Sequence, residues 1–266
     1  MPKVRQKPTS PRAARQDYSA PALEKGIQIF ELLAGEQSGL TISEIAYRLR
    51  RSISELFRIV MVLERTQWLQ KDPESARYTV TYRVLELAHR GTPAQAMSLV
   101  AAPLMSELSL QIHQSCHLVV LAGGHGLVIL RQENVSHPGG FAMRLGAIVN
   151  LIGSCAGHVL LAFSEAKARE DIFRLIPKPW PMRRPEVEKR LERVRQQGYE
   201  LRASRVATGV TDVSYPIHAR DEKVVAALSV PYLSAPGRTG QISIEQIQAR
   251  LEQTARRISE SLVLIR

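Results

Sequence analysis

The sequence predicts an α+β protein with two domains, an N-terminal winged helix-turn-helix and a C-terminal mixed α/β domain. Within residues 22–81, three successive segments have apolar residues at helical spacing, and a pattern typical of a β-hairpin follows them. In the second half, strands and helices mix without strict alternation, which favours α+β over a doubly wound sheet. We expect the winged domain at residues 21–83, a linker helix at 84–104 and the second domain at 105–266.

The first 20 residues are polar, basic and proline-containing, with five basic side chains and one acidic side chain. Such a composition cannot bury enough apolar surface to fold, so we expect a disordered arm. The arm could add non-specific contacts to phosphate groups, or it could have no role.

Two short segments have the form of capping boxes, each opening a predicted helix. Apolar residues at roughly helical spacing from Leu23 to Leu33 give a first helix, which the loop at residues 35–40 ends. The segment Thr41–Glu44 then pairs a hydroxyl with a glutamate three residues later, the signature of a helix start. The segment Ser52–Glu55 repeats this pattern and opens a longer helix that runs to about Gln67.

We expect one side of the longer helix to be buried, through Ile53, Leu56, Phe57, Val60 and Leu63. Residues 68–69 lead into a strand, residues 71–77 form a turn, and residues 78–80 form the returning strand. This hairpin is the wing.

Two helices joined by a tight turn and followed by a hairpin are the parts of a module that binds double-stranded DNA. The second helix enters the major groove with its N-terminal residues near base edges, and basic groups around it contact phosphates. The alternative is a plain packing unit or a protein-interaction module. Glu55 is unfavourable near phosphate unless it caps the helix or accepts from a cytosine amino group. The candidate DNA-binding residues are Arg50, Arg51, Ser52, Ser54, Glu55 and Arg58, with Lys71 and Arg77 in the wing.

Composition narrows the class of protein further. The chain has 266 residues and 44% hydrophobic side chains, enough for two modest cores. No apolar run approaches the roughly 20 residues of a membrane span, and no apolar segment follows the basic N-terminus as in a signal peptide. Two cysteines make no disulfide framework. We therefore expect a cytoplasmic protein without a membrane partner.

The net charge is +11 and the isoelectric point is near 10.0, a balance that suits a polyanionic partner. The surplus is not concentrated in the predicted winged domain, because residues 21–91 hold ten basic and nine acidic side chains. Part of it lies between Arg183 and Arg195, where a solvated helix face is the simpler interpretation.

The second domain shows apolar strands at residues 115–121 and 127–133 around a glycine-rich turn, which lacks the lysine ending of a phosphate-binding Walker loop. Further elements are predicted as a strand and turn at 141–152, helices at 154–163, 165–175 and 185–197, strands at 206–217 and 224–230, and a closing helix at 242–264.

Two cysteine and histidine pairs could suggest a metal site or a nucleophile with its base. Cys155 and His158 have the spacing of a half-site, but Cys116 and His117 are neighbours on a strand and point to opposite faces. Nothing marks an orienting acid or an oxyanion hole for a cysteine nucleophile. We therefore expect no catalytic residue, no metal ligand and no cofactor.

The loop before the helix at 154–163 suits anion binding better. Backbone amides at a helix N-terminus can bind a carboxylate. Arg202 would strengthen such a site if it turned inward. Arg144 is a second candidate, with a solvated strand end as the equal alternative.

The chain resembles the isocitrate lyase regulator (IclR) family of bacterial transcription factors along about nine-tenths of its length. No single one of its motifs is highly specific for this family, but the whole set of motifs in this order is. The residues that carry the resemblance are Ala22–Phe30, Leu40–Ala46, Arg58, Arg77-Tyr78, Arg144–Gly146, Gly153–Ala162, Gln197–Tyr199, Thr208–Val210, Tyr215–Ile217 and Ala226–Val230.

The resemblance implies a GAF-like effector-binding domain and a homodimer, possibly a tetramer, that represses or activates a catabolic operon in response to a small organic acid. Binding of the acid would move the domains and change how the recognition helices match DNA. The family's effector pocket maps onto Gly153, Ser154, Cys155, Ala156, Val210, Asp212, Ser229 and Pro231.

The sequence departs from the family pattern at three places. The segment Arg50–Glu55 replaces a turn that usually resembles Gly-Leu-Pro-Lys-Ser-Thr, so the family's operator preference does not transfer. His158 replaces the usual lysine, and Arg202 falls where some members have an acidic residue. Two rival functions stay open: a DNA-binding regulator without a ligand, and a small-molecule enzyme with an N-terminal interaction module.

Overall fold

The computed structural model describes residues 19–91, 94–134, 141–205, 207–233 and 242–264. The chain divides into two compact units, residues 1–91 and 92–266. Residues 1–18 of the expected basic arm lie outside the described residues. No helix in these ranges is long and apolar enough to cross a lipid bilayer.

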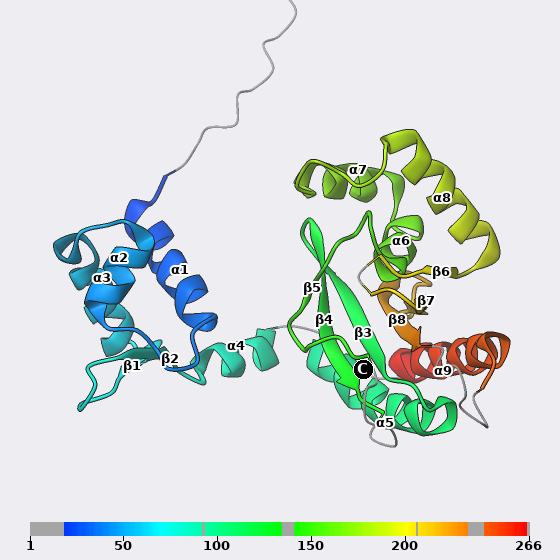
Figure 1. The fold of residues 1–266 in the computed structure, drawn as a ribbon, viewed down its shortest axis with the longest axis horizontal. Coiled ribbons are helices and arrows are strands. Elements are labelled where there is room, and N and C mark those ends of the chain that lie inside the picture. Colours follow the sequence, from blue (N-terminus) through cyan, green and yellow to red (C-terminus); the bar gives the residue numbers. More distant parts are fainter. Residues whose placement is uncertain (1–18, 92–93, 135–140, 206, 234–241, 265–266) are drawn as a thin grey trace, which may run out of the picture. The chain divides into compact units, whose positions relative to one another are not determined.

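The smaller unit is a helical domain with a two-stranded wing (Figure 1). In the wing, the antiparallel register pairs Leu69 with Val80 and Lys71 with Tyr78. One core, centred on Ile29, Ile45 and Leu56, holds the helices and the wing together. The elements are α1 (Pro21–Ala34), α2 (Ile42–Leu49), α3 (Ile53–Arg65), β1 (Leu69–Lys71), β2 (Tyr78–Val80) and α4 (Arg83–Gly91).

The two predicted capping boxes differ in the structure. At α2 the box is complete: the Thr41 hydroxyl accepts from the Glu44 amide, and the Glu44 carboxylate accepts from the Thr41 amide at 2.7 Å. At α3 only half is present, because Ser52 accepts from the Glu55 amide at 3.2 Å while the Glu55 carboxylate binds basic side chains instead. Arg50, in the left-handed region with φ of 54°, makes the turn between the helices.

The prediction that α3 buries Ile53 and Phe57 is wrong. Their side chains are 45% and 50% exposed, whereas Leu56 and Val60 are fully buried. A helix with 3.6 residues per turn that packs on one side buries only the residues of that side, and positions 53 and 57 lie at its margin. The apolar face of α3 is therefore wider than its buried side, and part of it is exposed to solvent.

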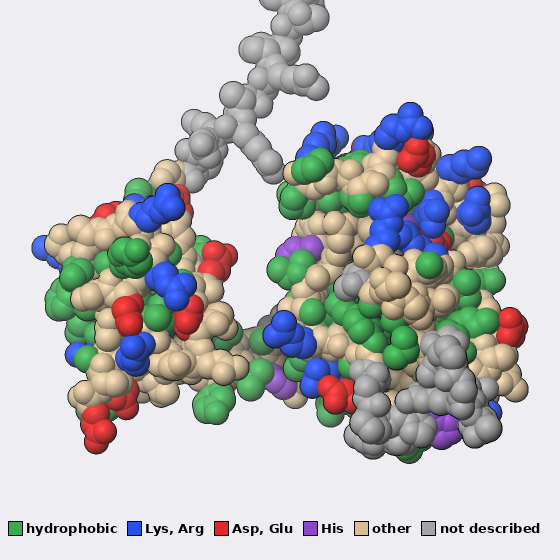
Figure 2. Space-filling view, in the orientation of Figure 1, with side chains coloured by type: hydrophobic (Ala, Val, Ile, Leu, Met, Phe, Trp, Pro, Cys, Tyr) green, Lys and Arg blue, Asp and Glu red, His purple; other side chains and the backbone are tan. Residues whose placement is uncertain are grey.

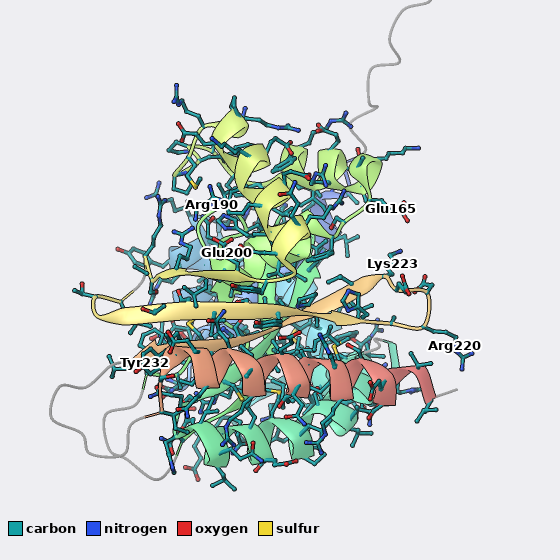
Figure 3. All side chains as sticks on the ribbon, turned by 90° about the vertical axis from the view of Figure 1, so that its right-hand side faces the viewer. Glu165, Arg190, Glu200, Arg220, Lys223 and Tyr232 are labelled. Atoms are coloured by element: carbon teal, nitrogen blue, oxygen red, sulfur yellow. The ribbon has the colours of Figure 1, made fainter. Side chains whose placement is uncertain are left out.

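The larger unit is built on one six-stranded antiparallel sheet in the order β5-β4-β3-β8-β7-β6. Figure 3 shows α8 on one side of the strands and α9 with α5 on the other. The elements are α5 (Ala94–Ile112), β3 (Cys116–Ala122), β4 (His125–Gln132), β5 (Ile148–Val149), α6 (Cys155–Ala162), α7 (Ala166–Leu175), α8 (Arg184–Gln197), β6 (Glu200–Ala203), β7 (Val210–His218), β8 (Val224–Leu233) and α9 (Ile244–Leu264).

The two faces of the sheet have separate cores. Leu118, Val213 and Leu228 pack with α5 and α9, while Val119 and Ala227 pack with α6, α7 and α8. Successive residues of a strand point to opposite faces, so each central strand supplies both cores in alternation.

Three details of the second domain differ from the sequence prediction. The strand expected around Phe141–Leu145 is irregular, and only Ile148 and Val149 pair with β4. The edge strand β6 is not predicted from the sequence, because its polar and apolar residues alternate over only four positions, too short a run to identify a strand. The stretch expected as a linker helix falls on α4 and on the beginning of α5.

Gly157 sets how closely α6 approaches the preceding loop. A Cβ at this position would overlap the carbonyl oxygen and the Cα of Leu151. We predict that Gly157→Ala lowers the free energy of unfolding by about 2 kcal/mol or more, because backbone must move. Gly153→Ala is the matched control, since its Cβ meets nothing nearer than the Asn150 Oδ1 atom at 3.3 Å. Urea unfolding of both variants measures the difference, and equal stability would contradict the prediction.

Candidate functional site

The outer face of α3 is a continuous exposed strip of mixed chemistry. Ser54, Phe57, Arg58 and Met61 lie along it with their side chains exposed. The Arg58 guanidinium has no partner among the described residues. An exposed helix face with a cation, a hydroxyl and apolar groups can read the major groove, where guanine offers acceptors and thymine a methyl group.

Glu55, a predicted DNA contact, is held by two cations of its own domain. Its Oε1 atom lies 2.6 Å from the Lys25 Nζ atom and 2.9 Å from the Arg51 Nη1 atom. The hydrogen bond from Lys25, followed by the charges of Lys25 and Arg51, lowers the Glu55 pKa, although desolvation opposes this. The carboxylate therefore does not stand as a free negative charge beside α3.

Arg77, the predicted wing contact, ties the wing to the helices. Its Nη1 atom donates to the Gly39 carbonyl at 2.8 Å, and its Nη2 atom donates to Glu44 at 3.0 Å. The Glu44 pKa is lowered mainly by the amide and hydroxyl of Thr41 and further by Arg77. Lys71, the other wing residue, is exposed and lies 5.8 Å from the Tyr78 ring centroid.

The second unit contains a cavity of about 330 Å³ between the loop that leads into α6 and the sheet face beneath it. Six of the eight predicted effector residues line it, and Val210 and Pro231 do not. The lining residues are His117, Phe141, Met143, Ile148, Val149, Asn150, Gly153, Ser154, Cys155, Ala156, Pro181, Ser204, Arg205, Asp212, Ser214 and Ser229.

Free backbone amides form one wall of the cavity. Asn150 Oδ1 accepts from the amides of Ile152 and Gly153 at 2.9 and 2.8 Å, and Ser154 Oγ accepts from the Gly157 amide at 3.0 Å. These bonds fix the loop and cap α6. Within the described ranges, three amides at the start of α6 have no protein acceptor: Ser154, Cys155 and Ala156.

A polar row on the sheet forms the floor. Ser229 is directly opposite His117 on one side and Ser214 on the other, and the two serine hydroxyls are 2.6 Å apart. Glu200 on β6 continues the row opposite Ser214. Directly opposite residues of antiparallel strands share a face, so these side chains all point toward α6. Sequence reasoning missed His117 and Ser214 as site residues, although single polar residues in apolar strands were a usable signal.

A network of His158, Glu200 and Arg190 contacts the loop before α6 on the side away from the cavity. The His158 Nε2 atom is 2.8 Å from the Ile152 carbonyl oxygen, and its Nδ1 atom is 3.3 Å from Glu200 Oε1. Arg190 of α8 donates to the same carboxylate at 3.0 Å. Figure 3 shows Arg190 and Glu200 on neighbouring elements. Both ring nitrogens face acceptors, an arrangement that a ring with two N–H groups satisfies fully.

Burial alone would raise the pKa of the Glu200 carboxyl, but hydrogen bonds and charges from His158 and Arg190 outweigh burial and lower it. Burial raises the pKa of Asp212, against the opposing effects of the Ser204 hydrogen bond and the Arg202 charge. Arg202 lies opposite Asp212 in the sheet, and its Nη1 atom is buried without a hydrogen-bond partner. Arg144 is exposed and does not line the cavity.

The cysteine and histidine pairs form no reactive centre in the described part of the chain. Burial raises the pKa of the Cys155 thiol, which donates to the Asp212 carbonyl at 3.3 Å, so the thiol stays protonated. Burial also raises the pKa of Cys116 to about 12, and this thiol faces α5. Within the described ranges, no three His, Cys, Asp or Glu side chains gather as metal ligands.

A winged helix-turn-helix followed by a domain with a ligand-sized cavity defines a ligand-responsive DNA-binding regulator. Residues 22–73 match the IclR helix-turn-helix domain, and residues 94–260 match the bacterial transcriptional regulator IclR C-terminal domain. The chain belongs to the IclR family of transcriptional regulators.

Individual relatives agree with this assignment. The chain is 24% identical over 246 residues to the regulator XynR of Escherichia coli, covering 91% of this chain and 96% of XynR. It is 22% identical to KdgR of the same species, covering 92% and 95%. An IclR homolog from Microbacterium hydrocarbonoxydans, solved with 4-hydroxybenzoate, shares the fold with a TM-score of 0.76 at 24% identity, covering 91% and 98%. At the family level the chain is a transcriptional regulator.

We predict that Glu200→Gln lowers the free energy of unfolding at pH 7 by about 3 kcal/mol, because it leaves His158 and Arg190 without their buried anion. The Glu200 pKa is lowered from 4.5, so the carboxylate stabilises the fold above that pH. The stabilisation is lost as the pH falls through the folded-state pKa, so the deficit of the variant should shrink at low pH. Urea unfolding at pH 7 and pH 4 tests this, with Glu192→Gln on α8, the helix that carries Arg190, as control. A deficit independent of pH would refute the ionic role.

Proposed function

We propose that the protein controls a catabolic operon in response to a small organic acid that binds in the cavity under α6. The observation that carries this proposal is the set of free amides at the start of α6, whose residues line a cavity of about 330 Å³. Amides at a helix N-terminus favour a carboxylate through hydrogen bonds and the positive end of the helix dipole.

The residues assigned to the acid are Gly153, Ser154, Cys155 and Ala156 in the loop and helix start, with Asp212 and Ser229 on the sheet. Val210 and Pro231 act through the strands that carry the lining residues. The relative solved with 4-hydroxybenzoate shows that this fold accommodates a small aromatic acid, which supports the proposed ligand class.

For DNA, we assign base reading to the exposed strip of α3. Ser54 and Arg58 supply polar groups, and Phe57 offers an apolar surface for a thymine methyl group. Arg50, Arg51, Ser52 and Lys71 lie where they can contact phosphates. Glu55 and Arg77 support the binding surface through their internal ion pairs rather than by touching DNA.

We further propose that residues 21–83 bind DNA, residues 84–104 link the domains and residues 105–266 bind the acid. Helix-turn-helix modules read paired half-sites as dimers, so the functional form is a homodimer or a pair of dimers. Binding of the acid changes the population of the DNA-binding arrangement.

A gel shift on the promoter region beside the gene tests the function directly. With competitor DNA at moderate salt, a discrete complex is expected, and one of a panel of aromatic and aliphatic acids should change its affinity. A complex that vanishes with salt would contradict specific binding. A specific complex that no acid alters would favour the rival, a regulator without a ligand.

Arg58→Ala should weaken binding to the specific site by about 5- to 100-fold, because a bidentate contact to guanine is worth about 1–3 kcal/mol. Non-specific binding should change little. Arg65→Ala is the control, since Arg65 lies on the last turn of the same helix, away from its N-terminal reading end. Quantitative gel shifts on specific and scrambled DNA measure both, and unchanged specific affinity would remove Arg58 from base reading.

A further inference from the structure

The floor of the cavity holds polar groups that the protein itself leaves unused. His117 is only 8% exposed, lines the cavity, and its Nδ1 atom has no hydrogen-bond partner among the described residues. Leaving a buried polar group unpaired costs about 1–3 kcal/mol. The ring, which borders the cavity, thus keeps hydrogen-bonding capacity that no described protein group uses.

The neighbours of His117 extend this polar region. Ser229 lies directly opposite on β8, and its hydroxyl is 2.6 Å from that of Ser214. Two hydroxyls that bond to each other still keep one free hydrogen and free lone pairs. The floor thus offers both donors and acceptors.

The His117 ring itself carries no positive charge. Burial lowers the pKa of His117 to about 4, so its ring is uncharged at neutral pH, with one N–H group and one lone pair. A neutral ring of this kind can donate to or accept from a hydroxyl group but offers no ion pair to an anion. The cations near the cavity are elsewhere: Arg205 lines it, and Arg202 lies opposite Asp212 in the sheet.

Apart from Asn150, Ser204 and Arg205, the remaining lining is apolar. Phe141, Met143, Ile148, Val149 and Pro181 surround the space next to the floor and the amide wall. The volume of about 330 Å³ lies at the small end of the range of ligand sites, about 300–1,000 Å³. It suits one compact hydrocarbon body between two polar ends.

We propose that the effector is a hydroxylated carboxylic acid, whose carboxylate binds the amides at the start of α6 and whose hydroxyl binds His117 and Ser229. His117 is then the residue that selects hydroxylated acids over the parent acids. This inference rests on the proposed function, that the cavity binds a small acid.

Calorimetric titration of the full-length protein tests the selection with matched acids. The panel pairs benzoate with 3- and 4-hydroxybenzoate and butanoate with 4-hydroxybutanoate. At least one hydroxylated acid should bind about 10-fold or more tightly than its parent acid.

In His117→Leu, the affinity for that hydroxylated acid should fall to the level of the parent acid, whose own affinity should not change. His117→Asn, which keeps a donor and an acceptor, should retain part of the preference and covers the case in which the leucine variant does not fold. His125→Leu is the control, because His125 lies at the start of β4 outside the cavity lining.

The outcomes separate the two proposals. If none of the acids binds, acid sensing in this cavity fails and the selection fails with it. If acids bind but the hydroxyl brings no advantage, or if the advantage survives in both His117 variants, acid sensing stands and the role of His117 is overturned.

Discussion

The alternation of side chains along the central strands is the constraint on which the second domain depends. Every second residue of β3, β7 and β8 enters an apolar core with α5 and α9. The residues between them face α6, where most are apolar but His117, Ser214 and Ser229 are not. Because one continuous sheet carries both faces, the first core can hold the strands rigid while the second face keeps a cavity. A polar floor is stable there only because the opposite core supplies the burial.

The position of α6 and of the loop before it forms the cavity above this floor. Because Gly157 has no side chain, the backbone of α6 packs directly against the backbone of Leu151. Asn150 accepts a hydrogen bond from the Gly153 amide, and Ser154 accepts one from the Gly157 amide. His158 then ties the loop to β6 through Glu200. Two departures from the family pattern therefore act near one site: His158 braces the loop from behind, and Arg202 lies opposite Asp212.

In the first domain, α3 packs on one side only, and its outer face stays exposed. Helix α3 buries Leu56 and Val60 and keeps Phe57 and Arg58 outside. The charged residues on and around α3 differ in their contacts: Glu55 and Arg77 form ion pairs within the domain, while Arg58 has no partner in the part of the chain that the structure describes. Figure 2 shows that the larger unit carries many Lys and Arg side chains over α7 and α8, so net charge alone would not have located the DNA-binding face.

Local chemistry determined much of this protein from the sequence alone: the winged helix-turn-helix, the cap at Thr41, most strands of the second domain, and the loop that starts α6. These features depend on periodicity and on neighbours three or four residues apart, which the sequence displays directly. Only the tertiary structure decided which polar residues meet. Ser229 pairs with both His117 and Ser214 because strands from distant parts of the chain align in one register, and Arg77 binds Glu44 across 33 positions. Pairing of this kind depends on which strands become neighbours, and no local pattern encodes that choice.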